Sequence, residues 1–234
     1  MVTMPTLREM LEAGVHFGHK TSRWDPRMNK FIFTAKSSVH VINLEKTAEC
    51  LDAAMKFLSQ ASASGKNIVF VGTKKQAQDL VKKAANDCGA HYVTERWLGG
   101  TLTNFNIVLR GVKNLERMKL KVSSPEYESM RKRDKVKLQK DIEKSERLVG
   151  GLIGMNSKPD VLILIGAHDE KNAICEAKKL GIPTVALVDT NANPGEIDYA
   201  IPANDDATKS ISLFANLFAK VIKEGKVTKA ASTK

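Results

Sequence analysis

Short apolar runs alternate along the chain with longer segments whose apolar residues recur at helical spacing. Such runs predict buried strands, which we place at residues 39–44, 67–72, 91–94, 161–167, 184–190 and 199–202. Strands that are apolar on both faces and alternate with helices are typical of a parallel sheet with helices on both faces. The pattern therefore predicts an α/β fold.

In the segments between these strands, apolar residues recur at helical spacing. We expect helices at residues 47–63, 74–88, 174–180 and 206–223. Gly89 and Gly181 follow two of these helices, at the position where a left-handed residue often ends a helix, and Gly225 follows the last one.

A different pattern interrupts this alternation between residues 105 and 150. Apolar residues there recur at steps of four, three, three and four, which predicts an amphipathic helix with a narrow seam made of Val108, Val112, Leu115, Met118 and Val122. Ser123-Ser124-Pro125 stops this helix, and a highly charged helix follows from about residue 126 to 148. We expect an inserted antiparallel helical hairpin of the coiled-coil kind.

This pattern defines the expected domain organisation. Residues 1–104 and 151–225 form one α/β domain, and residues 105–150 form the inserted hairpin. Residues 1–38 are an N-terminal extension of this domain, and residues 226–234, after it, are a basic C-terminal tail.

The distribution of charge indicates the class of partner. The chain carries a net charge of +11, and residues 105–150 hold 13 basic residues against 7 acidic ones. Residues 151–219 hold 5 basic residues against 9 acidic ones. An uneven surplus of this size favours one side that faces a polyanion such as nucleic acid. The acidic segment offers a docking face for a protein partner.

Cysteine spacing and hydropathy argue against a disulfide scaffold, a zinc ribbon and a membrane-spanning protein. Cys50, Cys88 and Cys175 are far apart in the sequence and form no C-x-x-C pair, which suits a reducing, cytoplasmic compartment. The longest apolar run, residues 161–167, is too short to cross a bilayer, and the N-terminus has no signal-peptide pattern. We expect no membrane partner.

Two histidines raise the question of a metal or catalytic site. His16 and His19 are three residues apart, as zinc ligands often are. Asp189 and the pair Asp205-Asp206 follow expected strands whose ends gather functional groups. A structural zinc or magnesium ion is one hypothesis, and an enzyme that uses one histidine as a base with Asp189 is another. Because the sequence contains no metalloprotease or nucleotide-binding motif, we favour histidines that only shape the loop, with no cofactor.

Basic and aromatic residues favour binding of nucleic acid instead, with the N-terminal extension of residues 1–38 facing RNA. Lys and Arg side chains neutralise phosphates, and polar side chains add hydrogen bonds. Our candidate contacts are Arg23, Arg27, Lys30, Lys74, Lys75, Arg96, Asn104, Arg110 and Lys113, together with Arg131, Lys132 and Arg133 if the hairpin faces RNA rather than solvent.

Two tryptophans lie within these basic stretches. Trp24 either stacks on an unpaired base or is buried against the sheet, whereas Trp97 is better explained as a core anchor.

Residues 71–78 form a strand–turn–helix segment whose Gly-Thr-Lys turn is either a plain tight turn or a phosphate contact.

Six blocks of sequence together resemble a known family. They are "AGVHFGHKTSRWDPRMNKFIF", "VHVINLEKT", "FVGTKKQA", "RWLGGTLTNF", "GIPTVALVDTN" and "IPANDDA". In this order, over nearly the whole chain, they resemble the bacterial-type small-subunit ribosomal protein uS2 family. The chain departs from the usual pattern at residues 149–152, and at Asn193-Pro194, where the family commonly has an acidic residue before the proline.

The resemblance implies a fold, a function and partners. It implies a Rossmann/flavodoxin-like sheet domain with a protruding helical hairpin. It also implies a structural constituent of the small ribosomal subunit that supports translation and is not an enzyme. The implied partners are 16S-type rRNA and neighbouring ribosomal proteins, notably the mRNA-binding protein bS1, rather than a second copy of the chain. The location is the cytoplasmic ribosome, with an organellar ribosome of the bacterial type as the alternative.

Overall fold

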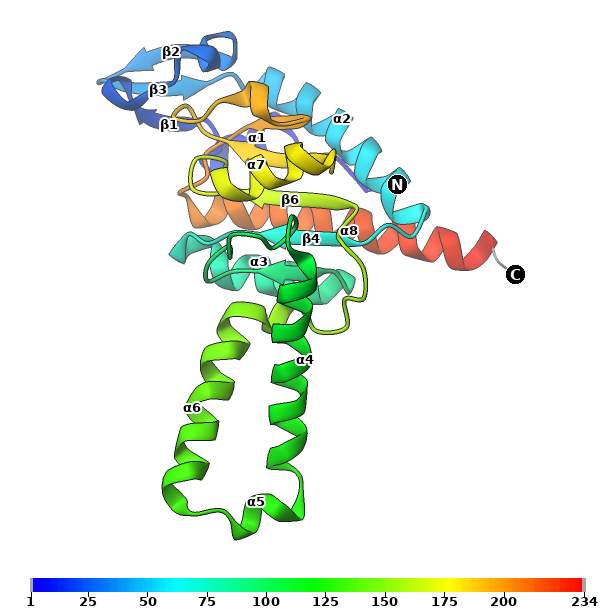
Figure 1. Ribbon diagram of the computed structural model, residues 1–234. Coiled ribbons are helices and arrows are strands. Elements are labelled where there is room, and N and C mark those ends of the chain that lie inside the picture. Colours follow the sequence, from blue (N-terminus) through cyan, green and yellow to red (C-terminus); the bar gives the residue numbers. More distant parts are fainter. Residues whose placement is uncertain (1, 233–234) are drawn as a thin grey trace.

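Five parallel strands form the central sheet of the computed structural model, which describes residues 2–232. Their order is β5 (His91–Val93), β4 (Ile68–Val71), β6 (Val161–Ile165), β7 (Thr184–Val188) and β8 (Tyr199–Pro202). Every residue of β4, β6 and β7 is buried, because helices cover both faces of the sheet (Figure 1). The predicted α/β fold is confirmed, with the sheet and flanking helices of a Rossmann-like domain.

Successive residues of each strand pack into two different hydrophobic cores, one on each face of the sheet. Ile68 and Phe70 pack on one face against α1 (Leu7–Glu12), α2 (Leu44–Ala63), α3 (Lys75–Cys88) and α8 (Thr208–Ser232). Val69 and Val71 pack on the other face against α7 (Lys171–Leu180) and the beginning of α4 (Phe105–Val122). Side chains of successive strand residues point to opposite faces, so a strand that is buried on both sides has no polar face.

A second, antiparallel sheet lies at the N-terminal end of the chain. It contains β1 (Phe17–Lys20), β3 (Val39–Ile42) and β2 (Ile32–Lys36) in that order. The expected strand at residues 39–44 therefore forms, but it lies outside the parallel sheet. A two-residue turn at Ser37 and Ser38, both with positive φ, reverses the chain and pairs β3 with β2.

Two short 3-10 helices connect β1 to β2. They are η1 (Thr21–Arg23) and η2 (Pro26–Phe31). The side chain of Asp25 accepts a hydrogen bond from the backbone N–H of Arg27 and so caps η2, while Met28 is fully buried in the core. This anchoring gives the connection a defined shape on the surface.

The helical hairpin between β5 and β6 projects away from the sheet (Figure 1). It contains α4, the short α5 (Pro125–Ser129) and α6 (Lys132–Val149). Val108, Val112 and Leu115 are buried in the half near the sheet, whereas Val122 near the tip is exposed. The second helix, expected from about residue 126, is broken at Met130–Arg131, because its apolar seam is too weak near the tip to hold one continuous helix.

The hairpin returns to the sheet through η3 (Gly150–Leu152), and η4 (Pro194–Glu196) lies between β7 and β8. A Cβ atom at Gly151 would overlap the backbone and ring of Tyr92 on strand β5. Glycine is therefore needed where the hairpin meets the edge of the sheet.

The last helix, α8, is longer than expected. It continues through Gly225 to Ser232, so residues 226–232 of the expected tail are helical, and residues 233–234 lie outside the described residues. A Cβ atom at Gly225 would lie 2.7 Å from Cβ of Ser62. Gly225 thus permits close packing of α8 on α2 instead of ending the helix.

No helix among residues 2–232 is both long enough and apolar enough to span a membrane.

Candidate nucleic-acid interface

The N-terminal strands are fixed to the carboxyl edge of the parallel sheet at Thr190. The backbone N–H of His19 donates to Oγ1 of Thr190 (2.8 Å), and the N–H of Asp25 donates to the Thr190 carbonyl oxygen (2.7 Å). A Cβ atom at Gly18 would lie 2.6 Å from Cγ2 of Thr190, so the glycine of "HFGH" permits this close approach. The basic stretch that follows is thereby placed beside the sheet.

The cations of this stretch point away from the core. Arg23, Arg27 and Lys30 are exposed. Arg27 makes a two-pronged pair with Asp25, with Nε–Oδ1 at 3.0 Å and Nη2–Oδ2 at 3.2 Å. The Nζ atom of Lys30 lies 4.8 Å from the centroid of the Phe31 ring.

Trp24 packs internally on one side. It is half-buried, and its ring centroid lies 5.0 Å from that of the buried His40, with an interplanar angle of 43°. This contact agrees with the burial alternative for Trp24 and leaves less of the ring for a partner. Stacking of Trp24 on RNA stays a prediction.

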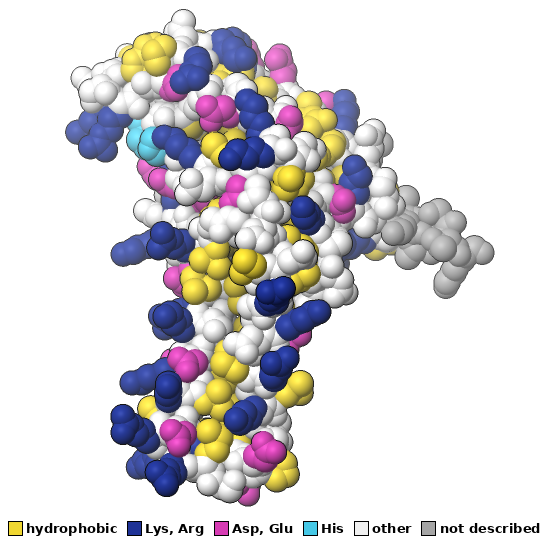
Figure 2. Space-filling view, viewed as in Figure 1, with side chains coloured by type: hydrophobic (Ala, Val, Ile, Leu, Met, Phe, Trp, Pro, Cys, Tyr) yellow, Lys and Arg dark blue, Asp and Glu magenta, His cyan; other side chains and the backbone are white. Residues whose placement is uncertain are grey.

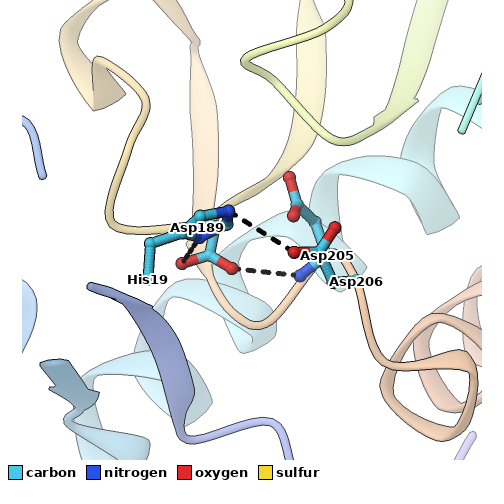
Figure 3. Close-up of side chains that lie close together, drawn as sticks. All are labelled: His19, Asp189, Asp205 and Asp206. Atoms are coloured by element: carbon cyan, nitrogen blue, oxygen red, sulfur yellow. Dashed lines mark hydrogen bonds and ion pairs between the residues drawn. The ribbon is translucent and has the colours of Figure 1, made fainter. Parts of the chain in front are cut away.

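One histidine and three aspartates, which we call the acidic cluster, meet at the same edge of the sheet (Figure 3): His19, Asp189, Asp205 and Asp206. His19 Nδ1 lies 3.0 Å from Asp189 Oδ1, and His19 Nε2 lies 3.4 Å from Asp206 Oδ2. One potential ligand atom from each residue lies within 4.8 Å of the others, a geometry compatible with one cation. Asp205 and Asp206, which adjoin in the sequence, both belong to this group.

His16 lies outside this cluster. Its ring packs against Phe17 at a centroid distance of 4.0 Å, and burial lowers the pKa of His16. The structure therefore separates the two histidines: His19 joins the acidic residues, and His16 packs beside β1, as expected of a histidine that shapes the loop.

Lys74 already neutralises part of the acidic cluster. Its ammonium lies 2.5 Å from Asp205 Oδ1, 2.8 Å from Asp206 Oδ1 and 3.6 Å from Asp169 Oδ2, and its side chain is only 12% exposed. Burial lowers the pKa of Lys74, but the carboxylates of Asp205 and Asp206 outweigh this and raise it above its usual value. The predicted phosphate contact of Lys74 would have to compete with these carboxylates.

Asp205 is the most deeply buried acid of the cluster. Burial and the charge of Asp189 raise its pKa, Lys74 opposes both effects, and together they bring the pKa to about 7. Its Oδ2 atom is buried and has no hydrogen-bond partner among the described residues. A buried oxygen without a donor is costly, so this oxygen favours one more positive or hydrogen-bonding group.

Glu176 holds the "RWLGGTLTN" loop through five hydrogen bonds. Its carboxylate accepts bonds from Trp97 Nε1 (3.1 Å), Gly100 N (2.8 Å), Leu102 N (2.9 Å) and both the N–H and the hydroxyl of Thr103 (each 3.1 Å). Trp97 itself is buried, which agrees with its expected role as a core anchor. The loop is therefore shaped around one carboxylate from α7.

The other candidate cations are spread over a long surface. Arg96 and Asn104 are exposed at the two ends of the clamped loop, and Lys75 is exposed at the beginning of α3. Lys and Arg side chains line the hairpin down to its tip (Figure 2), with exposed members at Arg110, Lys113, Arg131, Lys132 and Arg133. The structure does not gather these residues into one patch.

Comparison with known proteins decides the family. The family model for ribosomal protein S2 matches residues 10–225. The chain is 47% identical over 220 residues to the small ribosomal subunit protein uS2 of Geotalea uraniireducens (strain Rf4), covering 94% of this chain and 86% of that protein. It is 44% identical over 220 residues to that of Koribacter versatilis (strain Ellin345), covering 94% and 73%.

The chain belongs to the ribosomal protein S2 family. It is therefore a structural protein of the small ribosomal subunit in the cytoplasm, with a role in translation, and it is not an enzyme. The resemblance drawn from the six sequence blocks is confirmed, and the alternative of an enzyme with a histidine base is wrong.

Burial of acidic side chains reduces the negative charge that residues 151–219 expose in this S2-family chain. Four of the nine acidic residues between 151 and 219 are buried and hold other parts of the structure: Glu170, Glu176, Asp189 and Asp205. The five exposed acidic residues are matched by five exposed lysines in the same segment. The segment therefore does not present a strongly acidic face for a protein partner.

Glu176→Gln is expected to destabilise the fold. Burial raises the pKa of Glu176, but hydrogen bonds from the Thr103, Leu102 and Gly100 N–H groups outweigh this and lower the pKa below its usual value. An amide has one acceptor oxygen and would leave buried donors unpaired, at a cost of about 2–3 kcal/mol in the free energy of unfolding near pH 7.

The pH dependence of this difference has a defined sign. Because the folded-state pKa is lowered, the stabilisation is present above the unfolded-state pKa and is lost as pH falls through the folded-state value. Urea unfolding at several pH values should therefore show the two proteins converging below about pH 4. Glu143→Gln, on the exposed side of α6, is the matched control. Equal stability of Glu176→Gln and wild type at pH 7 would contradict the role of this carboxylate.

Proposed function

We propose that this S2-family chain binds 16S-type rRNA through its N-terminal basic stretch and the outer surface of its helical hairpin. The observation that carries the proposal is the charge of the hairpin. Eleven of the thirteen basic residues between 105 and 150 are exposed. Among the residues that the structure describes, the hairpin contains one ion pair, between Lys119 and Glu146 at 2.6 Å. Its cations are thus available for phosphates.

The proposed mechanism is binding by charge and shape. Lys and Arg side chains that replace counterions around the phosphates give an affinity that falls steeply with salt. Side chains cannot read the deep, narrow major groove of A-form RNA, so contacts to the backbone and to unpaired bases carry the recognition. The projecting hairpin extends the basic surface well beyond the sheet domain (Figure 2).

Arg96→Ala tests the contribution of the clamped loop. Arg96 is exposed beside the buried Trp97, so its removal should not disturb the core. Affinity for 16S-type rRNA fragments, measured at several salt concentrations, should fall, and the slope of log K against log salt should flatten by about 0.7–0.9, the contribution of one phosphate contact. Lys179→Ala on α7 is the control and should leave the slope unchanged. A slope that is the same in Arg96→Ala as in wild type would show that Arg96 makes no phosphate contact.

We also propose bS1 as a protein partner of this chain on the ribosome. Membership of the S2 family supports this proposal, whereas the balanced surface charge of residues 151–219 does not direct a partner there. Small subunits reconstituted without this chain should retain clearly less bS1 after sedimentation than subunits that contain it. Equal amounts of bS1 in both preparations would rule the partnership out.

We further propose that His19, Asp189, Asp205 and Asp206 can hold a divalent cation that fixes the N-terminal strands to the sheet. The buried, unpartnered Oδ2 of Asp205 supports this, as does the mixture of imidazole and carboxylate ligands, which suits Zn²⁺. Lys74 occupies part of the same space, so a bound cation would shift its ammonium away from Asp205.

Metal analysis distinguishes a cluster that binds a divalent cation from one whose negative charge is balanced by Lys74 alone. Protein dialysed against Zn²⁺ should retain about one equivalent per chain, and Zn²⁺ should raise the melting temperature. His19→Asn should abolish both effects, whereas His16→Asn, whose histidine lies outside the cluster, should keep them. Background zinc in the wild-type protein would overturn the proposal.

A further inference from the structure

One face of α4 carries a row of cations along the hairpin. Four exposed basic residues follow one another at steps of three, four and four, which places them on the same side of the helix: Arg110, Lys113, Arg117 and Lys121. Glu116 is the one acidic residue of α4, and it is half-buried. In the described part of the chain, the ion pair of the hairpin joins Lys119 to Glu146, so the four cations of this row are unpaired.

The surface of α6 has a more mixed charge. Its exposed side chains include six cations but also four carboxylates. By contrast, α4 exposes four cations and no carboxylate. A surface of one sign attracts phosphates more strongly than a mixed surface does. Of the two long helices of the hairpin, α4 is therefore better suited to lie against an RNA backbone.

Gly111 lies inside α4, beside this row, and packing within the chain does not explain it. It is exposed, and a Cβ atom at this position would lie in open space, with no neighbouring element within 4 Å. Glycine in a helix interior destabilises the helix relative to alanine, because it loses more backbone freedom on folding. Gly225, the other glycine inside a described α-helix, is needed for close contact with Ser62, whereas Gly111 has no such contact.

The missing side chain leaves a gap in the surface of α4. Residues three and four positions apart are neighbours on a helix, so Ile107 and Asn114, both exposed, flank Gly111. Arg110 and Lys113 belong to the adjoining row of cations. Glycine permits the backbone to come close to a ligand, and the amide of Asn114 offers a hydrogen-bond donor beside the gap.

We propose that the sugar-phosphate backbone of the small-subunit rRNA lies along this face of α4 and comes closest to the protein at Gly111. Arg110 and Lys113 neutralise the phosphates next to this point, and Asn114 donates a hydrogen bond to the RNA backbone. The inference rests on the proposed rRNA binding, to which it assigns one helix face and a point of closest contact.

Substitutions of Gly111 should change stability and binding in opposite directions. Gly111→Ala should raise the melting temperature by about 1–4 °C, because alanine is the better helix former and its methyl group meets no neighbour. The same change should weaken binding to small subunits depleted of this protein by about 5-fold, and Gly111→Gln by more than about 10-fold, because the added atoms hold the RNA away from the helix.

The salt dependence and a matched control accompany this measurement. The slope of log K against log salt should be unchanged in both Gly111 variants, because no charge is removed. Ser59→Ala and Ser59→Gln make the control, since Ser59 is an exposed residue of α2, away from the hairpin. Both control proteins should bind as wild type does.

Charge removal tests the assignment of the helix face. Arg110→Gln combined with Lys113→Gln should flatten the slope of log K against log salt by about 1.4–1.8, the contribution of two phosphate contacts. Lys137→Gln combined with Lys140→Gln removes the same charge from the exposed surface of α6 and should leave the slope close to that of wild type. Benzoylphenylalanine in place of Ile107, which is 57% exposed, should crosslink to rRNA in the reassembled subunit.

The outcomes separate this inference from the proposed function. If wild-type binding falls steeply with salt but both Gly111 variants bind as wild type does, rRNA binding stands and the close approach at Gly111 is wrong. The inference is also wrong if Gly111→Ala melts below wild type, if only the α6 pair of substitutions flattens the slope, or if position 107 crosslinks to protein alone. If wild-type binding does not respond to salt, the proposed rRNA binding itself fails.

Discussion

Thr190, two residues beyond the end of β7, joins the N-terminal sheet to the parallel sheet through its side-chain and carbonyl oxygens. This contact places β1 against the carboxyl edge, where His19 meets Asp189. It also sets the position of η1 and η2, which present the basic residues of the N-terminal stretch. Gly18 makes the contact possible, because a side chain at that position would overlap Thr190. The candidate interface at the N-terminus depends on this junction.

The surface that results is extended and has little in common with a catalytic pocket. Its cations lie on the N-terminal stretch, on the loop held by Glu176 and along the projecting hairpin (Figures 1 and 2). Two buried acidic groups near this surface are used internally, since Asp205 binds Lys74 and Glu176 binds backbone N–H groups. Exposed cations still outnumber exposed acidic groups along the hairpin, and this surplus over a long surface suits a large polyanion.

Local periodicity was sufficient to predict the sheet, most of the helices and the hairpin. Strands such as β6 and β7 are buried on both faces and therefore appear in the sequence as unbroken apolar runs. Gly89 and Gly181 do adopt left-handed conformations at helix ends, as expected. Gly225 does not, because its role is close contact with Ser62, 163 positions earlier in the sequence, and spacing along the chain carries no sign of such a contact.

Contacts within the candidate interface are likewise not visible from spacing along the chain. Glu176 lies within a predicted helix, and only the fold brings it to a loop more than seventy residues earlier. The strand–turn–helix pattern predicts a phosphate contact for Lys74, but the loop after β8 supplies carboxylates that bind it. The apolar run at β3 predicts a place in the parallel sheet, which is wrong, because such a run does not show which neighbour it pairs with.

Hydroxyl-radical footprinting of 16S-type rRNA in small subunits with and without this chain tests the central claim most directly. Binding through the N-terminal stretch and the hairpin predicts two separate protected regions of rRNA. Charge removal at Arg131, Lys132 and Arg133 should weaken the region that faces the hairpin and leave the other unchanged. Identical cleavage with and without the chain would contradict the account.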